Sequence, residues 1–350
     1  MIYIRTDANE VIATGHVMRC LTIADELKKI HKKVVFVVSD QKSAELIEKK
    51  DYPIIITHVK WNDVDIEQEY SIFKSFVKKT DLMLVDSYYL NSEYLTIIKN
   101  IMQIATFDDL FSEKKDADII INYNVFYRKF NYKERYAKEK CTLLLGEKYV
   151  PLREQFRKIK PELEPRKNSN KVLLMCGGAD KIGLIFGVLQ YIKKCNQELF
   201  LSIEWKIVIG KYYTNKNKLE QESNKFTNIE VLHNVENMAN LMHNCDLCIT
   251  AASTVLYECC AMLLPTIFCI VAEDQEYDAV FFKKGDMMLY CGDYMRTPDK
   301  TLENIKIHLE DLIYDMEMQR YMKIKMQSFI DGKGAERIAN SLVENISGRR

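Results

Sequence analysis

The sequence predicts an α/β protein with two units, each built on a doubly wound parallel β-sheet. Its 350 residues suggest two domains, because a domain has roughly 150 residues. In each half, short runs of β-branched residues alternate with amphipathic stretches of helical length, which is typical of βαβ units. A polar stretch with two prolines, residues 158–171, separates the two series.

The first half opens with an apolar run, Met1–Ile4, that predicts a strand. Lys33–Val38 (KVVFVV) is typical of a strand buried on both faces of a parallel sheet. Further strands are expected near Ile54 and at Leu82–Asp86, Ile104–Phe107, Asp118–Asn122 and Thr142–Leu145. Helices are expected at His16–Lys29, Ser43–Lys50, Ile66–Lys78 and Ser92–Asn100.

The second half repeats this alternation, and its tail is helical from Leu302 to Arg349 with a break at Asp331–Gly334. Strands are expected at Val172–Cys176, Trp205–Ile209, Ile229–Leu232, Leu247–Thr250 and Thr266–Val271. Helices are expected at Ile182–Lys194, Glu236–His243 and Thr254–Leu263. The expected domains are therefore 1–157 and 172–330, joined by a linker at 158–171. The helix within 331–350 is expected to pack back on the first domain.

Composition argues against several function classes. Lys plus Arg and Asp plus Glu are 50 each, so the formal net charge is zero and no global field favours nucleic acid or an anionic membrane. No apolar run reaches the roughly 18 residues of a membrane span, and we expect no signal peptide. The 10 cysteines include one Cys-x-x-Cys pair, Cys245 and Cys248, with no second pair to complete a zinc site. We therefore expect reduced thiols in a cytoplasmic protein without metal or cofactor, and a monomer fits the composition.

The segment Arg5–Cys20 (RTDANEVIATGHVMRC) is the strongest candidate for a functional site. It joins a strand, a turn with Gly15 and a helix N-terminus, where free N–H groups and the helix dipole favour an anion. His16 lies at that terminus, which favours the neutral imidazole that a general base needs. A lone histidine is more often a structural residue, so this alternative stays open at the level of pattern.

Polar residues also follow the other strands of the first half. Because carboxyl ends of parallel strands share one edge, these residues should converge with His16. They are Arg5, Asp7, Asp86–Tyr88, Asp108–Asp109, Asn122 and Asn124.

The second half has two comparable turns. Gly177 and Gly178 allow close approach of the backbone to a ligand, although a plain turn also uses glycine. Ser253 and Thr254 begin a helix whose first turn contains Glu258, an arrangement that can hold a phosphate and a ribose but also suits simple capping. Gln275 follows the next strand.

Several motifs resemble the nucleotide-sugar hydrolases of bacterial pseudaminic acid synthesis. The segments are TGHVMRCLTIA from Thr14, LVDSY from Leu84, INYN from Ile121, LGEKYVPLREQF from Leu145, CGGAD from Cys176, ASTVLYE from Ala252 and GKGAER from Gly332. The second half also resembles the UDP-binding half of GT-B glycosyltransferases, especially the lipid-linked N-acetylglucosaminyltransferase of cell-wall synthesis. Ala13 and Ser87 depart from the family pattern, which usually has Gly and His there.

The resemblance implies a GT-B fold with two Rossmann-like domains facing a cleft. It implies metal-independent, inverting hydrolysis of UDP-2,4-diacetamido-2,4,6-trideoxy-β-L-altropyranose to UDP and the free sugar. His16 corresponds to the general base and Tyr88 to a sugar-site tyrosine, and Asp7 is the third expected catalytic residue. The backbone at Asn234–Val235 would hold uracil. The expected substrate contacts are Arg5, Gly15, Arg19, Asn122, Asn124, Gly177, Gly178, Val235, Ser253, Thr254, Glu258 and Gln275.

Two other functions remain as alternatives. A glycosyltransferase of the same fold would need an acceptor surface, and Lys28–Lys33 shows no apolar cluster of that kind. A non-catalytic nucleotide-sugar-binding protein would tolerate the loss of His16 and Tyr88, yet both are present.

Overall fold

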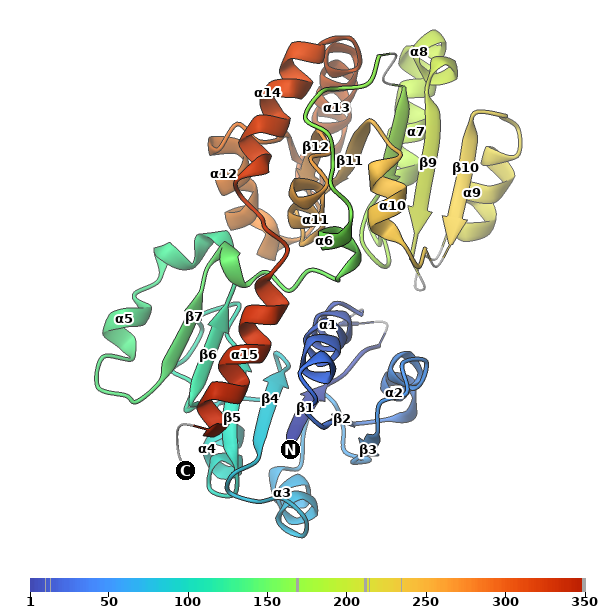
Figure 1. The fold of residues 1–350 in the computed structure, drawn as a ribbon. Coiled ribbons are helices and arrows are strands. Elements are labelled where there is room, and N and C mark those ends of the chain that lie inside the picture. Colours follow the sequence, from blue (N-terminus) through green and yellow to red (C-terminus); the bar gives the residue numbers. More distant parts are fainter. Residues whose placement is uncertain are drawn as a thin grey trace. The chain divides into compact units, whose positions relative to one another are not determined.

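Two parallel β-sheets are the framework of the computed structural model, which describes residues 1–347 except 10, 13, 168–169, 211–212, 214 and 234. The first sheet has the strand order β3-β2-β1-β4-β5-β6-β7, and the second has the order β10-β9-β8-β11-β12-β13 (Figure 1). All paired strands are parallel. The predicted pair of doubly wound α/β units is confirmed.

The first sheet and its helices come mainly from the first half of the chain. Its strands are β1 (Ile2–Thr6), β2 (Val34–Val38), β3 (Ile54–Ile56), β4 (Leu82–Asp86), β5 (Gln103–Phe107), β6 (Ile119–Asn122) and β7 (Thr142–Leu145). Its helices are α1 (Gly15–Lys29), α2 (Gln41–Glu48), α3 (Ile66–Lys74), α4 (Ser92–Lys99), η1 (Val125–Lys129), α5 (Tyr132–Arg135), η2 (Glu147–Tyr149) and α15 (Gly334–Ser347).

The second sheet and its helices lie between these segments in the sequence. Its strands are β8 (Lys171–Met175), β9 (Glu204–Ile209), β10 (Ile229–His233), β11 (Leu247–Ala251), β12 (Thr266–Ile270) and β13 (Leu289–Asp293). Its helices are α6 (Gln155–Lys158), α7 (Leu184–Cys195), α8 (Gln197–Ser202), α9 (Lys216–Ser223), α10 (Met238–His243), α11 (Val255–Ala261), η3 (Glu273–Gln275), α12 (Glu276–Lys284), α13 (Pro298–Tyr314) and α14 (Met316–Gln327).

The chain divides into unit 1, residues 1–153 with 332–350, and unit 2, residues 154–331. Helix α15 packs against α1 and η2 within unit 1, where the red helix lies beside blue and green elements in Figure 1. It begins at Gly334, where an added Cβ would collide with the Val150 carbonyl oxygen. Only glycine allows this close approach of two backbones.

The boundary between the units lies four residues before the predicted end of the first domain, at Arg153 and Glu154. The expected linker, 158–171, is part of unit 2. Within this stretch, Glu164 accepts a hydrogen bond from Arg320 at 2.9 Å, and Arg166 donates to Asp246 at 3.3 Å. These polar contacts hold the described part of the stretch to the rest of unit 2, and its low apolar content did not indicate them.

The predicted element bounds differ from the structure in two ways. Strand β1 continues to Thr6 instead of ending at Ile4, because its pairing with β4 continues to Thr6 and Asp86. Helices α8, α9 and α12 and strand β13 were not expected from the sequence. Helix α9 buries only Leu219 and Ser223, so it lacks the apolar stripe by which an amphipathic helix is recognised.

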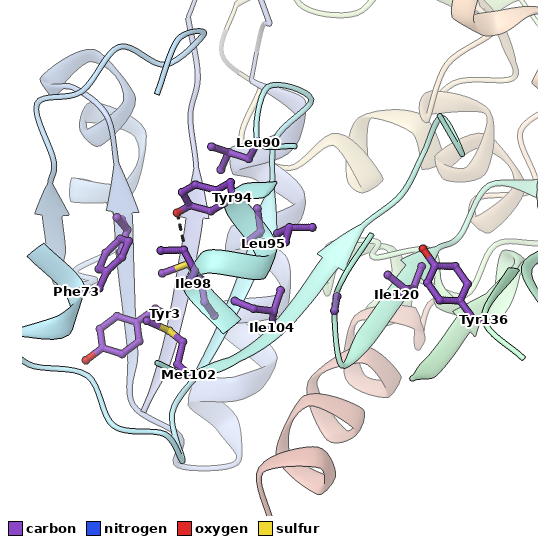
Figure 2. Packing of buried hydrophobic residues seen from close by; sticks show 14 of the residues in the cluster. Tyr3, Phe73, Leu90, Tyr94, Leu95, Ile98, Met102, Ile104, Ile120 and Tyr136 are labelled. Atoms are coloured by element: carbon purple, nitrogen blue, oxygen red, sulfur yellow. Dashed lines mark hydrogen bonds between the residues drawn. The ribbon is translucent and has the colours of Figure 1, made fainter. Parts of the chain in front are cut away.

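The core of unit 1 between the sheet and helices α3 and α4 contains aromatic side chains as well as aliphatic ones (Figure 2). Tyr94 of α4 is 1% exposed, and its hydroxyl donates to Glu69 at 2.8 Å. The same hydroxyl lies 3.9 Å from the Met83 sulfur. A buried tyrosine hydroxyl needs such a partner, so this core depends on a carboxylate that is itself buried.

That carboxylate belongs to a buried ionic cluster at the carboxyl end of β1. The Arg5 guanidinium is fully buried and lies 3.0 Å from Glu69 and 2.6 Å from Asp7. It also donates to the Ser39 hydroxyl at 2.8 Å. Burial opposes its charge, but the Glu69 and Asp7 carboxylates outweigh that effect and raise the pKa of Arg5. The cluster joins β1, β2 and α3 at the start of the loop that leads to α1.

We expect Arg5→Met to destabilise unit 1 by about 3–5 kcal/mol, because it leaves two buried carboxylates without their cation. The measurement is urea unfolding followed by circular dichroism. The control is Lys114→Met, which removes a cation from the exposed pair with Glu139 and should cost less than about 1 kcal/mol. Equal losses in the two variants would contradict a structural role for the cluster.

Candidate functional site

The order of the first sheet reverses between β1 and β4, and ligands of doubly wound sheets bind at such a switch point. Thr6 of β1 is paired with Asp86 of β4 at this edge. After β1, the chain enters α1 at Gly15, so His16 is in the first turn of a helix that starts at the same edge. The topology thereby brings His16 and Asp86 together, although 70 residues separate them.

His16 and Asp86 form a hydrogen-bonded pair. The distance from His16 Nδ1 to Asp86 Oδ1 is 2.6 Å, and the two side chains are 9% and 1% exposed. An ionised carboxylate can only accept, so Nδ1 carries the hydrogen and the lone pair of the neutral ring is on Nε2. Nε2 makes no hydrogen bond to the described residues. A carboxylate-oriented imidazole with a free Nε2 is the arrangement of a general base.

Arg19, one turn further along α1, fixes the Asp86 carboxylate. Its Nε donates to Oδ2 at 2.6 Å, and its Nη2 donates to Oδ1. Burial alone would raise the pKa of Asp86, but the positive charge of Arg19 and the hydrogen bonds from Arg19 and His16 hold that pKa well below its usual range. The guanidinium carbon lies 4.1 Å from the centre of the Phe107 ring. Arg19 therefore keeps Asp86 ionised and in one orientation.

Further side chains from the neighbouring strand ends complete the cluster around His16. Arg19 Nη2 also donates to Asp109 Oδ2 at 2.8 Å, and the Asn124 amide donates to Asp109 Oδ1 at 3.2 Å. The Tyr88 ring meets the His16 ring edge-on, with centroids 4.6 Å apart. Tyr88 is 51% exposed, so this side of the cluster is open to a ligand.

Of the residues expected at this site, the structure brings His16, Arg19, Tyr88 and Asn124 together. Asp86 and Asp109 were among the polar strand-end residues expected to converge with His16, but no individual role was predicted for them. The signal was their position at the carboxyl ends of β4 and β5, the strands that follow β1 in the sheet order. Strand order is a property of the tertiary structure, so the sequence could not show which of these side chains contact His16 or Arg19.

Other expected residues lie apart from the His16 cluster. Arg5 and Asp7 are committed to the buried cluster with Glu69, because Arg5 lies within β1 and Asp7 directly follows its last residue. Asn122 is fully buried and donates to the Tyr132 hydroxyl at 2.8 Å, which makes it a support for the turn before η1. Gly15 is exposed, with open space where a Cβ would lie. Ala13 lies outside the described residues.

In unit 2 the two expected glycines form a tight turn after β8. Gly177 has a φ of +59°, and an added Cβ at Gly210 would collide with the Gly178 backbone. Asp180 follows and accepts hydrogen bonds from the amides of Leu184 at 2.8 Å and Ile185 at 3.0 Å. A carboxylate therefore already occupies the N-terminus of α7, and it satisfies N–H groups that a phosphate would otherwise use.

The second expected turn, between β11 and α11, keeps its hydroxyls available. Thr254 is at the N-cap position of α11 but makes no side-chain capping hydrogen bond. Ser253 is half-buried and Thr254 is exposed, and Glu258 is in the first turn of the same helix. Simple capping by Thr254, the alternative left open by the sequence, is therefore not what the structure shows.

The remaining expected residues of unit 2 have different surroundings. Gln275 accepts a hydrogen bond from the Val271 amide at 2.9 Å, so its side-chain oxygen supports the loop after β12. Val235 is half-buried at the end of β10, and Asn234 lies outside the described residues. A cavity of about 220 Å³ opens between α12 and β13, with Glu276, Tyr290 and Arg296 in its lining. None of the residues expected from the sequence lines it.

Two kinds of feature are absent from the part of the chain that the structure describes. Within it, no group of three or more His, Cys, Asp and Glu side chains is arranged to hold a metal ion. No helix in these ranges has the length and apolar character to cross a membrane.

The fold and comparisons with known proteins define the class of this protein. Residues 186–338 match the family model of the glycosyltransferase family 28 C-terminal domain. The structure of MurG from Acinetobacter baumannii superposes with a TM-score of 0.67 at 13% identity, covering 98% of this chain and 99% of that one. The glycosyltransferase SsfS6 of Streptomyces sp. SF2575, solved with thymidine diphosphate, gives a TM-score of 0.59 at 10% identity, covering 97% and 99%. The chain therefore has the GT-B fold of nucleotide-sugar enzymes.

Sequence relatives agree with this class. The UDP-2,4-diacetamido-2,4,6-trideoxy-β-L-altropyranose hydrolase of Campylobacter jejuni is 25% identical over 81% of this chain and 97% of its own length. The spore coat polysaccharide biosynthesis protein SpsG of Bacillus subtilis is 23% identical over 93% and 92%. An uncharacterised protein of Methanocaldococcus jannaschii is 27% identical over 76% of this chain, which spans about half (54%) of that protein's length. These similarities support the family resemblance that the sequence motifs indicated.

We expect Asp86→Asn to lower the free energy of unfolding at pH 7 by about 2 kcal/mol, because it removes a charged hydrogen-bond acceptor from Arg19 and His16. The folded-state pKa of Asp86 is depressed, so its stabilising effect is present above about pH 4 and is lost as the pH falls further. The urea midpoints of the wild type and Asp86→Asn should therefore differ by a constant amount from pH 7 to about pH 4 and approach each other between pH 4 and pH 3. Asp116→Asn, at a carboxylate that is 44% exposed, is the control and should change little at any pH. A constant difference for Asp86→Asn across this range would contradict the assignment.

Proposed function

We propose that the protein is a nucleotide-sugar hydrolase that cleaves the anomeric C–O bond of UDP-2,4-diacetamido-2,4,6-trideoxy-β-L-altropyranose with inversion and without a metal. The observation that carries the proposal is the His16–Asp86 pair, at 2.6 Å, in which Nε2 of His16 makes no hydrogen bond to any residue that the structure describes. The similarity to the Campylobacter hydrolase supports the choice of substrate.

The proposed reaction uses one positioned base and a good leaving group. His16 Nε2 takes a proton from water while the water oxygen attacks the anomeric carbon. The C–O bond to the diphosphate breaks, and its electron pair leaves with UDP. Asp86 stabilises the imidazolium that forms, and one base of this kind contributes about 10²–10⁴-fold to the rate. Tyr88, at the open side of the cluster, would contact the sugar.

Unit 2 would bind the UDP part of the substrate. The hydroxyls of Ser253 and Thr254 would donate to the diphosphate, and the backbone at Gly177 and Gly178 allows close approach. Glu258 would accept hydrogen bonds from the ribose hydroxyls. The support is twofold: Thr254 makes no capping hydrogen bond, and a protein of the same fold, SsfS6, was solved with a nucleoside diphosphate.

A glycosyltransferase is the second candidate, because the family model and the structural neighbours are glycosyltransferases. In that case His16 would activate an acceptor hydroxyl instead of water. A protein that binds a nucleotide sugar without catalysis is a third candidate, although a purely binding protein has no need of a carboxylate-oriented imidazole. A hydrolase, a glycosyltransferase and a non-catalytic binding protein can all have this fold. An assay of the reaction is therefore needed to distinguish these three functions.

The first test is UDP release from the altropyranose nucleotide sugar in the presence of EDTA. We expect equimolar UDP and free sugar from the wild type, and a kcat lower by about 10²–10⁴-fold in His16→Asn because the base is lost. His31→Asn is the matched control, since His31 is an exposed histidine of unit 1 with a φ of +57° that asparagine also tolerates. UDP release only after addition of an acceptor would favour the transferase. UDP binding without any turnover would favour the binding protein.

The second test is UDP affinity, which does not depend on the reaction. We expect the double variant Ser253→Ala, Thr254→Val to weaken UDP binding about tenfold or more, because two hydrogen bonds to a charged diphosphate are lost. Isothermal titration calorimetry measures this directly. Ser202→Ala removes a hydroxyl that donates to the Leu199 carbonyl elsewhere in unit 2, so it should bind UDP like the wild type. Unchanged affinity in the double variant would refute this position for the diphosphate.

A further inference from the structure

Arg19 is shared between two buried carboxylates, and this gives the His16 cluster an unusual charge balance. Its Nη2 lies within hydrogen-bond distance of both Asp86 and Asp109. The Arg19, Asp86 and Asp109 side chains are 11%, 1% and 7% exposed. With a neutral His16 these three ionised groups sum to −1, and with a protonated His16 the cluster is neutral. Little water is available to compensate the excess negative charge.

We infer that Asp109 sets the proton affinity of His16 by balancing the charge of Arg19. Asp109 is a positioning residue, because it acts through the guanidinium. The inference deepens the proposed function and rests on His16 being the base of that reaction.

The effect of Asp109 follows from what would remain without it. Arg19 and Asp86 alone form a neutral pair, and Arg19 Nη2 is only 3.2 Å from His16 Nδ1. A protonated His16 and Arg19 would then share Asp86 as their only carboxylate partner in the cluster, and the two cations would repel each other. This repulsion would disfavour protonation of His16. With Asp109 present, Arg19 has a second anion at 2.8 Å, and the imidazolium keeps Asp86 as its own counterion. Asp109 therefore makes His16 a stronger base.

The other titratable side chains that contact this cluster, among the described residues, do not change this balance. The Cys20 thiol of α1 lies 3.4 Å from Asp86 Oδ2, and burial, with the Asp86 charge, raises the pKa of that thiol. Tyr123, which follows β6, accepts from Arg19 at 2.9 Å, and burial raises its pKa to about 12 against the effect of Arg19. Burial and the charge of Asp109 also raise the pKa of Tyr88. These three groups are neutral at pH 7, so among the described residues Asp86, Arg19 and Asp109 supply the charge of the cluster.

The geometry also holds Asp109 in place. The Asn124 amide donates to its Oδ1 at 3.2 Å, and the Tyr88 hydroxyl lies 3.5 Å from Oδ2. Its neighbour Asp108 points elsewhere: it accepts from the Tyr132 hydroxyl at 3.1 Å and from the Phe111 amide at 3.1 Å. The chain thus offers two adjacent buried carboxylates, of which one contacts Arg19 and the other does not.

The test is NMR titration of the His16 imidazole in the full-length protein labelled at histidine, with His16→Asn used to assign its signal. We expect Asp109→Asn to lower the midpoint of the His16 titration by roughly 0.5–1 pH unit. Asp108→Asn should leave the midpoint unchanged, although it removes a charge one residue away. Asp109→Glu, which keeps the charge, should restore most of the difference. An unchanged midpoint in Asp109→Asn, or an equal fall in Asp108→Asn, would overturn the inference.

The same variants separate this inference from the proposed function. If the protein hydrolyses the nucleotide sugar, the acidic limb of kcat/KM in Asp109→Asn should move to lower pH by the same amount as the NMR midpoint. If no hydrolysis occurs but the NMR midpoint falls, the proposed reaction fails while the control of His16 by Asp109 stands. Hydrolysis with no change in either the midpoint or the acidic limb would refute the role of Asp109 alone.

Discussion

The pairing of Arg19 with Asp86 and Asp109 is the interaction on which the candidate site of unit 1 depends. It joins a helix, α1, to the carboxyl ends of β4 and β5, and it fixes the carboxylate that orients His16. Burying three charges costs free energy that ion pairing only partly returns. Apolar side chains at this edge would stabilise the fold as well or better. Buried charges that are kept despite their cost in free energy of folding are typical of functional sites.

A second buried cluster lies at the end of β1, and its chemistry is similar but its environment is not. Arg5 is enclosed by Asp7, Glu69 and Ser39, and every one of these side chains is at most 3% exposed. The His16 cluster, by contrast, ends at the half-exposed Tyr88. The Arg-x-Asp motif after the first strand therefore supports the loop toward His16 from within. It has no open side from which a ligand could reach it.

In unit 2, too, some of the polar groups expected to bind the ligand already have hydrogen-bond partners within the protein, whereas the Thr254 hydroxyl makes no capping hydrogen bond. Asp180 uses the N-terminal amides of α7, and Gln275 is bound to the Val271 amide. The hydroxyl of Thr254 is not engaged in capping, which makes the β11–α11 turn the better candidate for an anion. Gly177 is explained by its φ of +59°, and Gly210 by its close approach to the Gly178 backbone. Backbone geometry thus accounts for part of a motif that also suits a ligand.

The sequence by itself determined the two α/β units and most strand positions, and it predicted a functional site at the turn that carries His16. These depend on local properties: β-branched runs, helical periodicity, and a glycine before a helix that starts with histidine. It predicted that the strand-end residues converge, but not which of them contact His16 and Arg19, because Asp86 and Asp109 are 70 and 93 positions from His16 and become neighbours only through the order β1-β4-β5. Nor could it distinguish Arg5, which is enclosed, from Arg19, which holds Asp86 in place, since both lie in the same segment beyond the predicted strand Met1–Ile4. The tertiary structure decided these points, because burial and charge pairing between strand ends are set by sheet order and not by distance along the chain.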